Sequence, residues 1–204
     1  MNKLIMMEGV DGSGKSTQIK LLKQVYGSCI HFTKEPFDPA EELETLTDPF
    51  EKAAILAADR VHHASVIKPV LEQRSVICDR GPLSMMAYQW PALKVVDEWS
   101  WSLLWTLNDW AMRGLDVDAT IILDIPVDKA FLRVTERAAQ SLTIPPPTTE
   151  DVDEMAAAAK IYAEKWEGPK LIKWVGKPYR VNADRPAEEV HQDILKIVEK
   201  VLAS

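Results

Sequence analysis

A glycine-rich octapeptide near the amino terminus constrains the fold of this chain more than any other feature. Residues 9–16 read GVDGSGKS and match the pattern G-x-x-x-x-G-K-S/T at every fixed position. A wholly apolar segment, residues 4–7, precedes the octapeptide, and apolar residues at helical spacing follow it. In this order the glycines let backbone N–H groups converge on phosphate oxygens, and the start of the helix adds partial positive charge. The sequence therefore predicts a site for a nucleoside triphosphate.

Side chains in this loop, and two residues further along, have the chemistry that phosphoryl transfer needs. Lys15 can reach the β- and γ-phosphates, and the Ser16 hydroxyl can ligate Mg²⁺. Asp79 can hold Mg²⁺ or its water and Arg80 can hold phosphate charge in transit, although a surface ion pair at a strand end is the alternative. We therefore expect ATP and Mg²⁺ to bind. The predicted contacts in the loop are Gly9, Val10, Asp11, Gly12, Ser13, Gly14, Lys15, Ser16 and Thr17.

Signatures of two other classes of phosphate-loop protein are missing from the sequence. A GTPase would carry the guanine-reading tetrapeptide N-K-x-D, which does not occur here. A motor-type ATPase would end a hydrophobic run in Asp-Glu, whereas residues 76–78 are followed by Asp79 and Arg80. These absences favour the third class, the small-molecule kinases.

Short apolar segments alternate with helical spacings along the whole chain, which predicts an α/β fold. The expected strands cover residues 4–7, 29–32, 75–78, 120–125 and 179–182. Helices are expected from residue 16 and over 50–72, 84–90, 95–113, 126–139, 153–167 and 186–202, with 141–151 irregular because of three consecutive prolines. We predict one domain, residues 1–204, with a parallel sheet, helices on both faces and the ligand at the carboxyl ends of the strands.

Composition and charge restrict the partners and the location of the chain. Acidic residues outnumber basic ones by 31 to 24, and the net charge of −7 disfavours nucleic acid as the main partner. Two cysteines are too few for a disulfide framework and indicate a reducing compartment. The sequence contains no apolar stretch of about 18–20 residues, so we expect no membrane partner and a cytoplasmic location.

Further motifs give the chain a resemblance to the thymidylate kinase family along nearly its whole length. The matching segments are residues 8–18, 33–36, 58–60, 79–80 with Ser84 and 87–89, 107–108, 114–115, 118–120 and 123–126. Each short match is weak alone, but together they occur in the family's order. The resemblance implies a five-stranded parallel sheet with a mobile lid, and a homodimer. It also implies transfer of a phosphoryl group from ATP to dTMP, giving dTDP.

The resemblance also assigns acceptor contacts to particular residues. By position, Lys34 and Arg80 meet the acceptor phosphate, Arg60 reads the edge of the base, and Asp11 faces the sugar 3′ hydroxyl. Other matched positions lie around the base and sugar, although Tyr88 could instead be core and Gln89 an ordinary polar helix residue. The implied acceptor contacts are Asp11, Lys34, Pro36, Leu56, Arg60, Arg80, Ser84, Tyr88 and Gln89.

Three positions depart from the family pattern in the acceptor region. Leu56 stands where a phenylalanine stacks on thymine, Gly81 stands where the family has an aromatic residue, and Lys34 replaces an arginine. A broad-specificity deoxynucleoside monophosphate kinase is therefore an alternative, as is a deoxynucleoside kinase. A non-catalytic nucleotide-binding protein is the third reading, and the intact Lys15 and Asp79 weigh against it.

The lid is expected at roughly residues 135–153. Members of the resembled family carry a catalytic arginine either in the phosphate loop or in the lid, and position 12 of this chain is glycine. We therefore expect the lid region to supply it, with Arg137 catalytic and Arg133 in contact with the nucleotide. A solvated helix face, paired with Glu136 and Asp128, is the alternative for both arginines.

Four tryptophans, Trp99, Trp101, Trp105 and Trp110, fall close together before the fourth expected strand. Such a group could stack on bases. A helix this apolar more often packs in a core or an interface, so we expect packing, partly at a dimer contact.

Overall fold

Five parallel strands form one sheet in the order β2-β3-β1-β4-β5. The strands are β1 (Leu4–Glu8), β2 (His31–Lys34), β3 (Val76–Asp79), β4 (Ala119–Asp124) and β5 (Lys177–Asn182). The structure is a computed structural model, and it describes residues 1–38, 43, 45–93, 99–141, 145–164 and 172–204.

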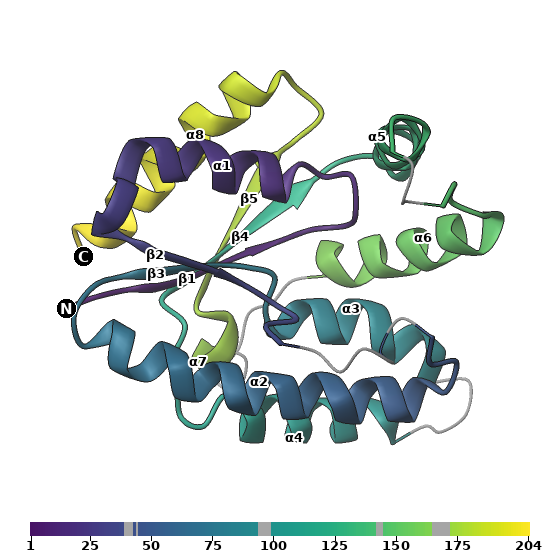
Figure 1. The fold of residues 1–204 in the computed structure, drawn as a ribbon, viewed down its shortest axis with the longest axis horizontal. Coiled ribbons are helices and arrows are strands. Elements are labelled where there is room, and N and C mark those ends of the chain that lie inside the picture. Colours follow the sequence, from purple (N-terminus) through teal and green to yellow (C-terminus); the bar gives the residue numbers. More distant parts are fainter. Residues whose placement is uncertain (39–42, 44, 94–98, 142–144, 165–171) are drawn as a thin grey trace.

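Helices cover both faces of the sheet, as Figure 1 shows. They are α1 (Lys15–Tyr26), α2 (Pro49–Leu71), α3 (Pro82–Leu93), α4 (Ser100–Ala111), α5 (Val127–Ala139), α6 (Thr149–Ala163), α7 (Ile172–Val175) and α8 (Ala187–Leu202). Helices α1 and α8 lie on one face, and α2, α3 and α4 lie on the other (Figure 1). The predicted fold class is therefore confirmed.

The apolar central strands account for this layering. All five residues of β1 are buried, as are the first five of β4, so both faces of the sheet need a covering layer. Helices α1 and α8 bury the apolar stripes that contain Leu22 and Ile194, whereas polar side chains occupy much of their other sides. Within the described ranges, no helix has the length and apolar character needed to cross a bilayer. The cytoplasmic location stays a prediction.

The predicted boundaries of two segments early in the chain are wrong. The second strand covers His31–Lys34 instead of residues 29–32, because a 3₁₀ turn (Gly27–Cys29) follows α1 and Gly27 has a φ of 52°. Helix α3 continues through Pro91 to Leu93, whereas we expected an end before that proline.

Two predictions in the second half of the chain also need correction. Residues 141–151 are not irregular throughout, because α6 begins at Thr149, where Thr148 and Asp151 form a reciprocal capping box. The short helix α7 was not predicted. Of the helix expected over 95–113, the structure has α4, and residues 95–98 lie outside the described ranges.

The register of the strands brings the functional segments together at one edge of the sheet. Asp79 is paired with Met7 of β1 on one side and with Lys34 of β2 on the other. The phosphate loop follows β1 directly, and Glu35 and Arg80 follow the neighbouring strands. Segments far apart in sequence therefore meet at the carboxyl edge, as the parallel sheet predicts.

Candidate active site

The phosphate loop depends on a glycine at position 12. Gly12 has a φ of +79°, and a Cβ placed there would lie 2.2 Å from the carbonyl oxygen of Ala130 in α5. Any side chain at this position would be strained and would collide with backbone. The close approach of α5 thus excludes an arginine from position 12 of the loop, and α5 itself carries Arg133 and Arg137 into the same cavity.

Lys15 lies inside the loop, where burial lowers the pKa of its ammonium group. Its Nζ donates to the carbonyl oxygens of Gly9 and Val10, at 2.8 and 3.0 Å, and lies 3.9 Å from the Asp11 carboxylate. Burial lowers the pKa of Lys15 to about 8, although the nearby carboxylates favour the charged form. Gly9 and Val10 therefore act through their carbonyl groups, which hold the lysine.

A polar pair at the start of α1 has the donor set of a divalent-cation site. The Ser16 hydroxyl donates to Asp79 Oδ2 at 3.1 Å. Asp79 Oδ1 is buried and has no hydrogen-bond partner among the residues that the structure describes. Hydroxyl and carboxylate oxygens are ligands that Mg²⁺ prefers, so these side chains fit that ion.

Asp11 and Arg80 form an ion pair at the centre of the site. Arg80 follows β3 in a left-handed conformation, with a φ of 71°, and its backbone N–H donates to the Met7 carbonyl at 2.9 Å. Its guanidinium lies over the Tyr88 ring, 5.2 Å from the ring centroid, and the Asp11 N–H donates to the Tyr88 hydroxyl. The unfavourable backbone conformation of Arg80 is thus held by several contacts, a pattern typical of functional sites.

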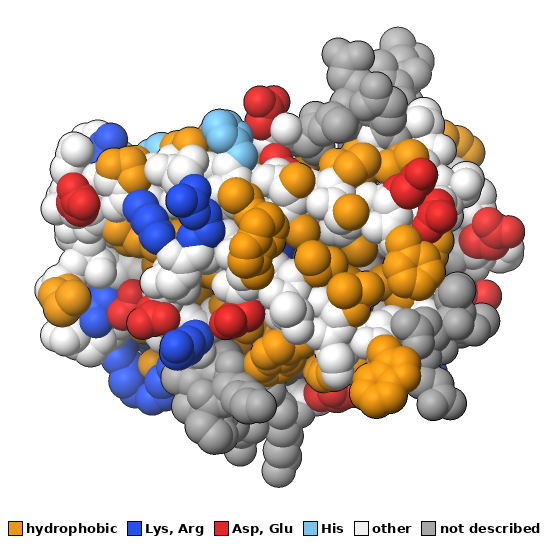
Figure 2. Space-filling model, turned by 90° about the horizontal axis from the view of Figure 1, so that it is seen from below, with side chains coloured by type: hydrophobic (Ala, Val, Ile, Leu, Met, Phe, Trp, Pro, Cys, Tyr) orange, Lys and Arg blue, Asp and Glu red, His pale blue; other side chains and the backbone are white. Residues whose placement is uncertain are grey.

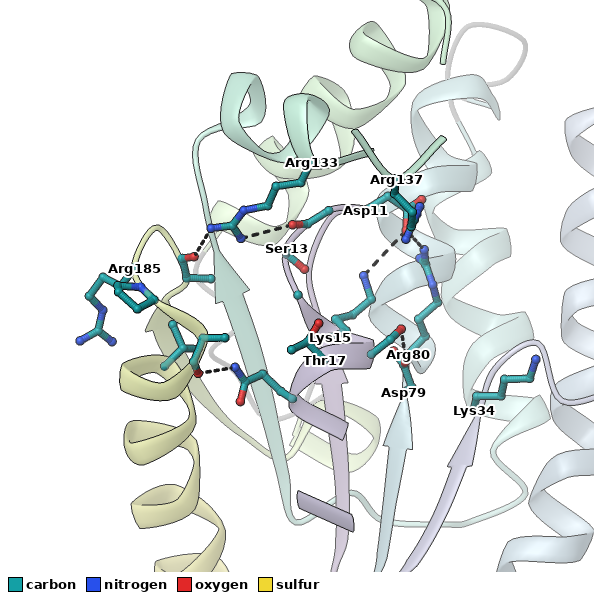
Figure 3. Close-up of a pocket in the computed structure, with 18 of the residues that line it drawn as sticks. Asp11, Ser13, Lys15, Thr17, Lys34, Asp79, Arg80, Arg133, Arg137 and Arg185 are labelled. Carbon is teal, nitrogen blue, oxygen red and sulfur yellow. Dashed lines mark hydrogen bonds and ion pairs between the residues drawn. The ribbon is translucent and has the colours of Figure 1, made fainter. Parts of the chain in front are cut away.

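A cavity of about 620 Å³ opens over the phosphate loop. Arg133 spans its rim from α5 and donates to the backbone carbonyls of Gly12 and Ala183, whereas the exposed Arg137 makes no hydrogen bond with another described residue (Figure 3). Other predicted residues line the same cavity: Asp11, Ser13, Gly14, Lys15, Ser16, Thr17, Lys34, Asp79 and Arg80. The cavity can hold a polyphosphate against several cationic side chains.

The opposite wall of this first cavity was not predicted. It comes from the segment between β5 and α8, and its residues are Ala183, Arg185, Pro186, Ala187 and Val190. The Gln18 amide of α1 donates to the Ala187 carbonyl at 2.9 Å and so connects this wall to the phosphate-loop helix (Figure 3). The sequence offered no signal here beyond an amphipathic helix.

A second cavity, of about 330 Å³, lies beside the first. It brings together all but one of the predicted acceptor contacts, namely Asp11, Pro36, Leu56, Arg60, Arg80, Ser84, Tyr88 and Gln89. The exception, Lys34, lines the first cavity and lies on the far side of Asp79 and Arg80 from Arg185 (Figure 3). Met85 and Glu154 also line the second cavity and were not predicted.

The two cavities share one wall, which Asp11, Glu35 and Arg80 form. A phosphate-binding loop lies on one side of this wall, and a smaller, partly apolar cavity lies on the other. This arrangement suits two ligands that meet end to end at Arg80, with the larger triphosphate in the first cavity.

Comparison with known proteins identifies the family. A family model described as "Thymidylate kinase" matches residues 7–194, which include both cavities. The chain belongs to the thymidylate kinase family. Its relatives include a protein of Thermococcus gammatolerans named "Probable thymidylate kinase", with 32% identity over 225 residues, covering 100% of this chain and 99% of the relative. A "Thymidylate kinase" of Symbiobacterium thermophilum is 34% identical over 220 residues, covering 99% of this chain and 95% of the relative.

Within this thymidylate kinase fold, a buried network surrounds Arg60. Its Nε donates to both oxygens of Glu35, at 3.2 and 2.9 Å, and its Nη2 donates to Glu35 Oε2 at 2.7 Å. Glu35 also contacts His63 Nδ1 at 3.3 Å, and His63 Nε2 lies 2.8 Å from the Thr33 hydroxyl. Arg60 and its neighbouring charges lower the pKa of the Glu35 carboxyl, so that the pair stays ionised although it is buried.

Glu8 forms another buried network that the sequence did not reveal. Its carboxylate accepts from the Ser84 backbone N–H at 3.1 Å, from the Ser84 hydroxyl at 2.6 Å and from the Tyr162 hydroxyl at 3.0 Å. Burial raises the pKa of Glu8 to about 7. The network joins β1, α3 and α6, and it fixes Ser84 in the wall of the second cavity.

The structure also gives a physical reason for one departure from the family pattern. A Cβ placed at Gly81 would lie 2.9 Å from Met6 Sδ, so Met6 fills the space that a side chain there would enter. At a second of the three departures, Leu56 is half-buried and lines the second cavity, where it supplies an aliphatic surface instead of an aromatic ring.

Proposed function

We propose that this protein transfers the γ-phosphoryl group of ATP to dTMP, giving ADP and dTDP. Membership of the thymidylate kinase family supports this reaction. The observation that carries the proposal is the wall of Asp11, Glu35 and Arg80 shared by the two cavities. Two nucleotides bound on either side would meet with their phosphates at Arg80, which is the geometry that direct transfer needs.

Each cavity then has a role that its side chains support. Lys15 neutralises charge on the triphosphate, and Arg133 covers it from α5. On the acceptor side, Arg80 holds the acceptor phosphate and Lys34 approaches it from the adjoining cavity. Asp11 faces the sugar 3′ hydroxyl, and Arg60 reads the base. Pro36, Ser84, Tyr88 and Gln89 complete the acceptor contacts.

We expect Mg²⁺ to bind with ATP at Ser16 and Asp79. The buried Asp79 Oδ1, which has no partner in the described parts of the chain, supports this assignment. The ion neutralises charge on the phosphates when it is bound. The role of these two side chains is to supply a hydroxyl and a carboxylate oxygen at the mouth of the phosphate loop.

The proposal is tested by measuring phosphoryl transfer from ATP to dTMP and, for comparison, to thymidine. In a coupled assay of ADP release, activity should require dTMP as the acceptor and should be absent with thymidine. If ADP is released with thymidine but not with dTMP, the protein is a deoxynucleoside kinase. If no ADP is released with either compound, the proposal is contradicted in favour of a non-catalytic nucleotide-binding protein.

A broad-specificity deoxynucleoside monophosphate kinase is the second candidate. Leu56 favours it, because an aliphatic side chain in the acceptor cavity gives up the stacking of a ring on the base. Such stacking contributes about 1–3 kcal/mol per base elsewhere. The phosphate-handling residues would be the same, so only the choice of acceptor separates the two candidates.

Arg137 is expected to act on the transition state, with little effect on binding of the acceptor. It lines the donor cavity, and its guanidinium is exposed and makes no hydrogen bond with other described residues. Arg137→Ala should therefore lower kcat by at least about tenfold and leave the Kd of dTMP nearly unchanged. Steady-state kinetics and calorimetric titration measure the two quantities.

Arg133→Ala is the matched comparison for this prediction. Because Arg133 is bonded to the Gly12 and Ala183 carbonyls, its loss should raise the KM of ATP more than it lowers kcat. A larger loss of kcat in Arg133→Ala than in Arg137→Ala would show that Arg133 is the catalytic arginine.

The face of α2 and α4 supports the homodimer that the family resemblance implies. Figure 2 shows hydrophobic side chains gathered on this face, where Leu103 and Trp110 of α4 are 41% and 65% exposed. Trp101 and Trp105 pack instead against Trp90 and Trp174, with ring centroids 5.0 and 4.9 Å apart. We expect sedimentation equilibrium to give twice the chain mass of 23.0 kDa, and Leu103→Glu to give one chain mass. A parent protein that sediments as a monomer would contradict the dimer.

A further inference from the structure

All the N–H donors of the Arg60 guanidinium have acceptors, and these acceptors differ in strength. Glu35 takes the Nε–H and one Nη2–H, and the Gly81 carbonyl lies 3.4 Å from Nη2. Nη1 donates to the side-chain oxygen of Asn108 and to Met85 Sδ, the latter at 3.3 Å. A thioether is a weak acceptor, so the Nη1–H that faces Met85 is the donor held least strongly.

Met85 links this donor to the acceptor cavity. Its side chain is buried, and it lines the cavity together with Arg60 and Leu56. A base carbonyl that enters here is a much stronger acceptor than sulfur, so it can take over the Nη1–H. Of the Arg60 donors, this one combines a weak partner with a position at the cavity wall.

Asn108 fixes the other hydrogen of the same nitrogen. It lies on α4, outside both cavities, and is completely buried. Its side-chain oxygen accepts from Arg60 Nη1, and its Nδ2 donates to the Pro82 carbonyl at 3.4 Å, at the first residue of α3. The second bond orients the amide with its oxygen toward Arg60.

We propose that Asn108 is a positioning residue for recognition of the acceptor base. By accepting one Nη1–H of Arg60, it turns the other Nη1–H toward Met85 and the cavity, where a carbonyl of the base receives it. Glu35 holds the opposite edge of the guanidinium, so the two residues together determine its plane. The inference rests on the proposed function, because it assigns to Arg60 the reading of the acceptor base.

Asn108→Leu tests this role, because leucine has a similar size and no acceptor. We expect the KM of dTMP to rise about tenfold, with kcat and the KM of ATP changed less than about twofold. The ratio of kcat/KM for dTMP to that for dCMP should fall at least about threefold. The reason is that a guanidinium in another orientation no longer discriminates between the carbonyl of thymine and the amino group of cytosine at position 4. Asn108→Asp keeps an acceptor oxygen at the same reach and should retain most of this ratio.

Control variants separate positioning from a general structural effect. Lys200→Ala, an exposed change in the last turn of α8 and away from both cavities, should match the parent protein in every constant. If Asn108→Leu does not fold, Asn108→Ser takes its place with the same expectation, because the shorter hydroxyl does not reach Nη1. Thermal melts identify the folded variants.

Two results with the variants would overturn the inference. One is a folded Asn108→Leu protein with an unchanged ratio of dTMP to dCMP. The other is an equal rise in the KM of ATP and dTMP, which indicates a structural role only. A parent protein without preference for dTMP over dCMP would instead refute base reading by Arg60 and the inference with it, and this failure is visible before any variant is made.

Discussion

Replacement of Lys15 by alanine is expected to lower kcat at least about a hundredfold. The Lys15 ammonium is the buried cation inside the phosphate loop, held by the Gly9 and Val10 carbonyls. Transfer of a phosphoryl group depends on positioning and on neutralising charge, so loss of this cation raises the barrier by about 2.7 kcal/mol or more. A coupled ADP-release assay with dTMP measures the change.

The conditions and the control for this experiment follow from the structure. The assay belongs at pH 7, below the Lys15 pKa of about 8, so that the parent lysine is mostly charged. Lys20→Ala changes an exposed lysine of the same helix and should leave turnover as it is. Near-normal turnover of a folded Lys15→Ala protein would contradict a phosphate-loop kinase.

Removal of Mg²⁺ should abolish detectable activity. In the proposed assignment the Ser16 and Asp79 oxygens hold the ion beside the triphosphate, and its removal leaves the cationic side chains of the cavity without the charge that transfer needs. Rates measured in excess EDTA should fall to background and return when Mg²⁺ is added beyond the chelator.

A variant of Asp79 tests whether this side chain is the one that holds the Mg²⁺ ion. Asp79→Asn keeps the shape and removes the negative charge, so it should lower kcat at least about tenfold and raise the Mg²⁺ concentration needed for half-maximal rate. Asp109→Asn, an exposed change on α4, is the control. Undiminished rates in excess EDTA would exclude the metal from the reaction.

The parts of the site that could be predicted are those whose residues are adjacent in sequence. The loop glycines, Lys15 and Ser16 lie between a buried strand and a helix, so their pattern alone determines the local backbone. Asp79 and Arg80 could be added because the carboxyl ends of parallel strands meet at one edge. The register that pairs Asp79 with Met7 and Lys34 confirms that argument.

Contacts between distant segments were beyond prediction from one sequence. Asn108 reaches Arg60 across 48 residues, and Tyr162 reaches Glu8 across 154. Nothing in the local pattern of either residue separates it from an ordinary helical residue. The start of α6 was missed for a different reason, since the prolines before Thr149 obscured a capping box in the sequence.

The specificity constants for dTMP and dCMP test the central claim most directly, with dUMP and dGMP measured beside them. Arg60 can donate to the carbonyl that thymine carries at position 4, where cytosine carries an amino group that cannot accept and leaves this donor with only the weak thioether of Met85. We therefore expect kcat/KM for dTMP to exceed that for dCMP by at least about tenfold. Equal values across the four acceptors would indicate a broad-specificity kinase, and a preference for dCMP would contradict the assignment of Arg60 and of dTMP as the acceptor.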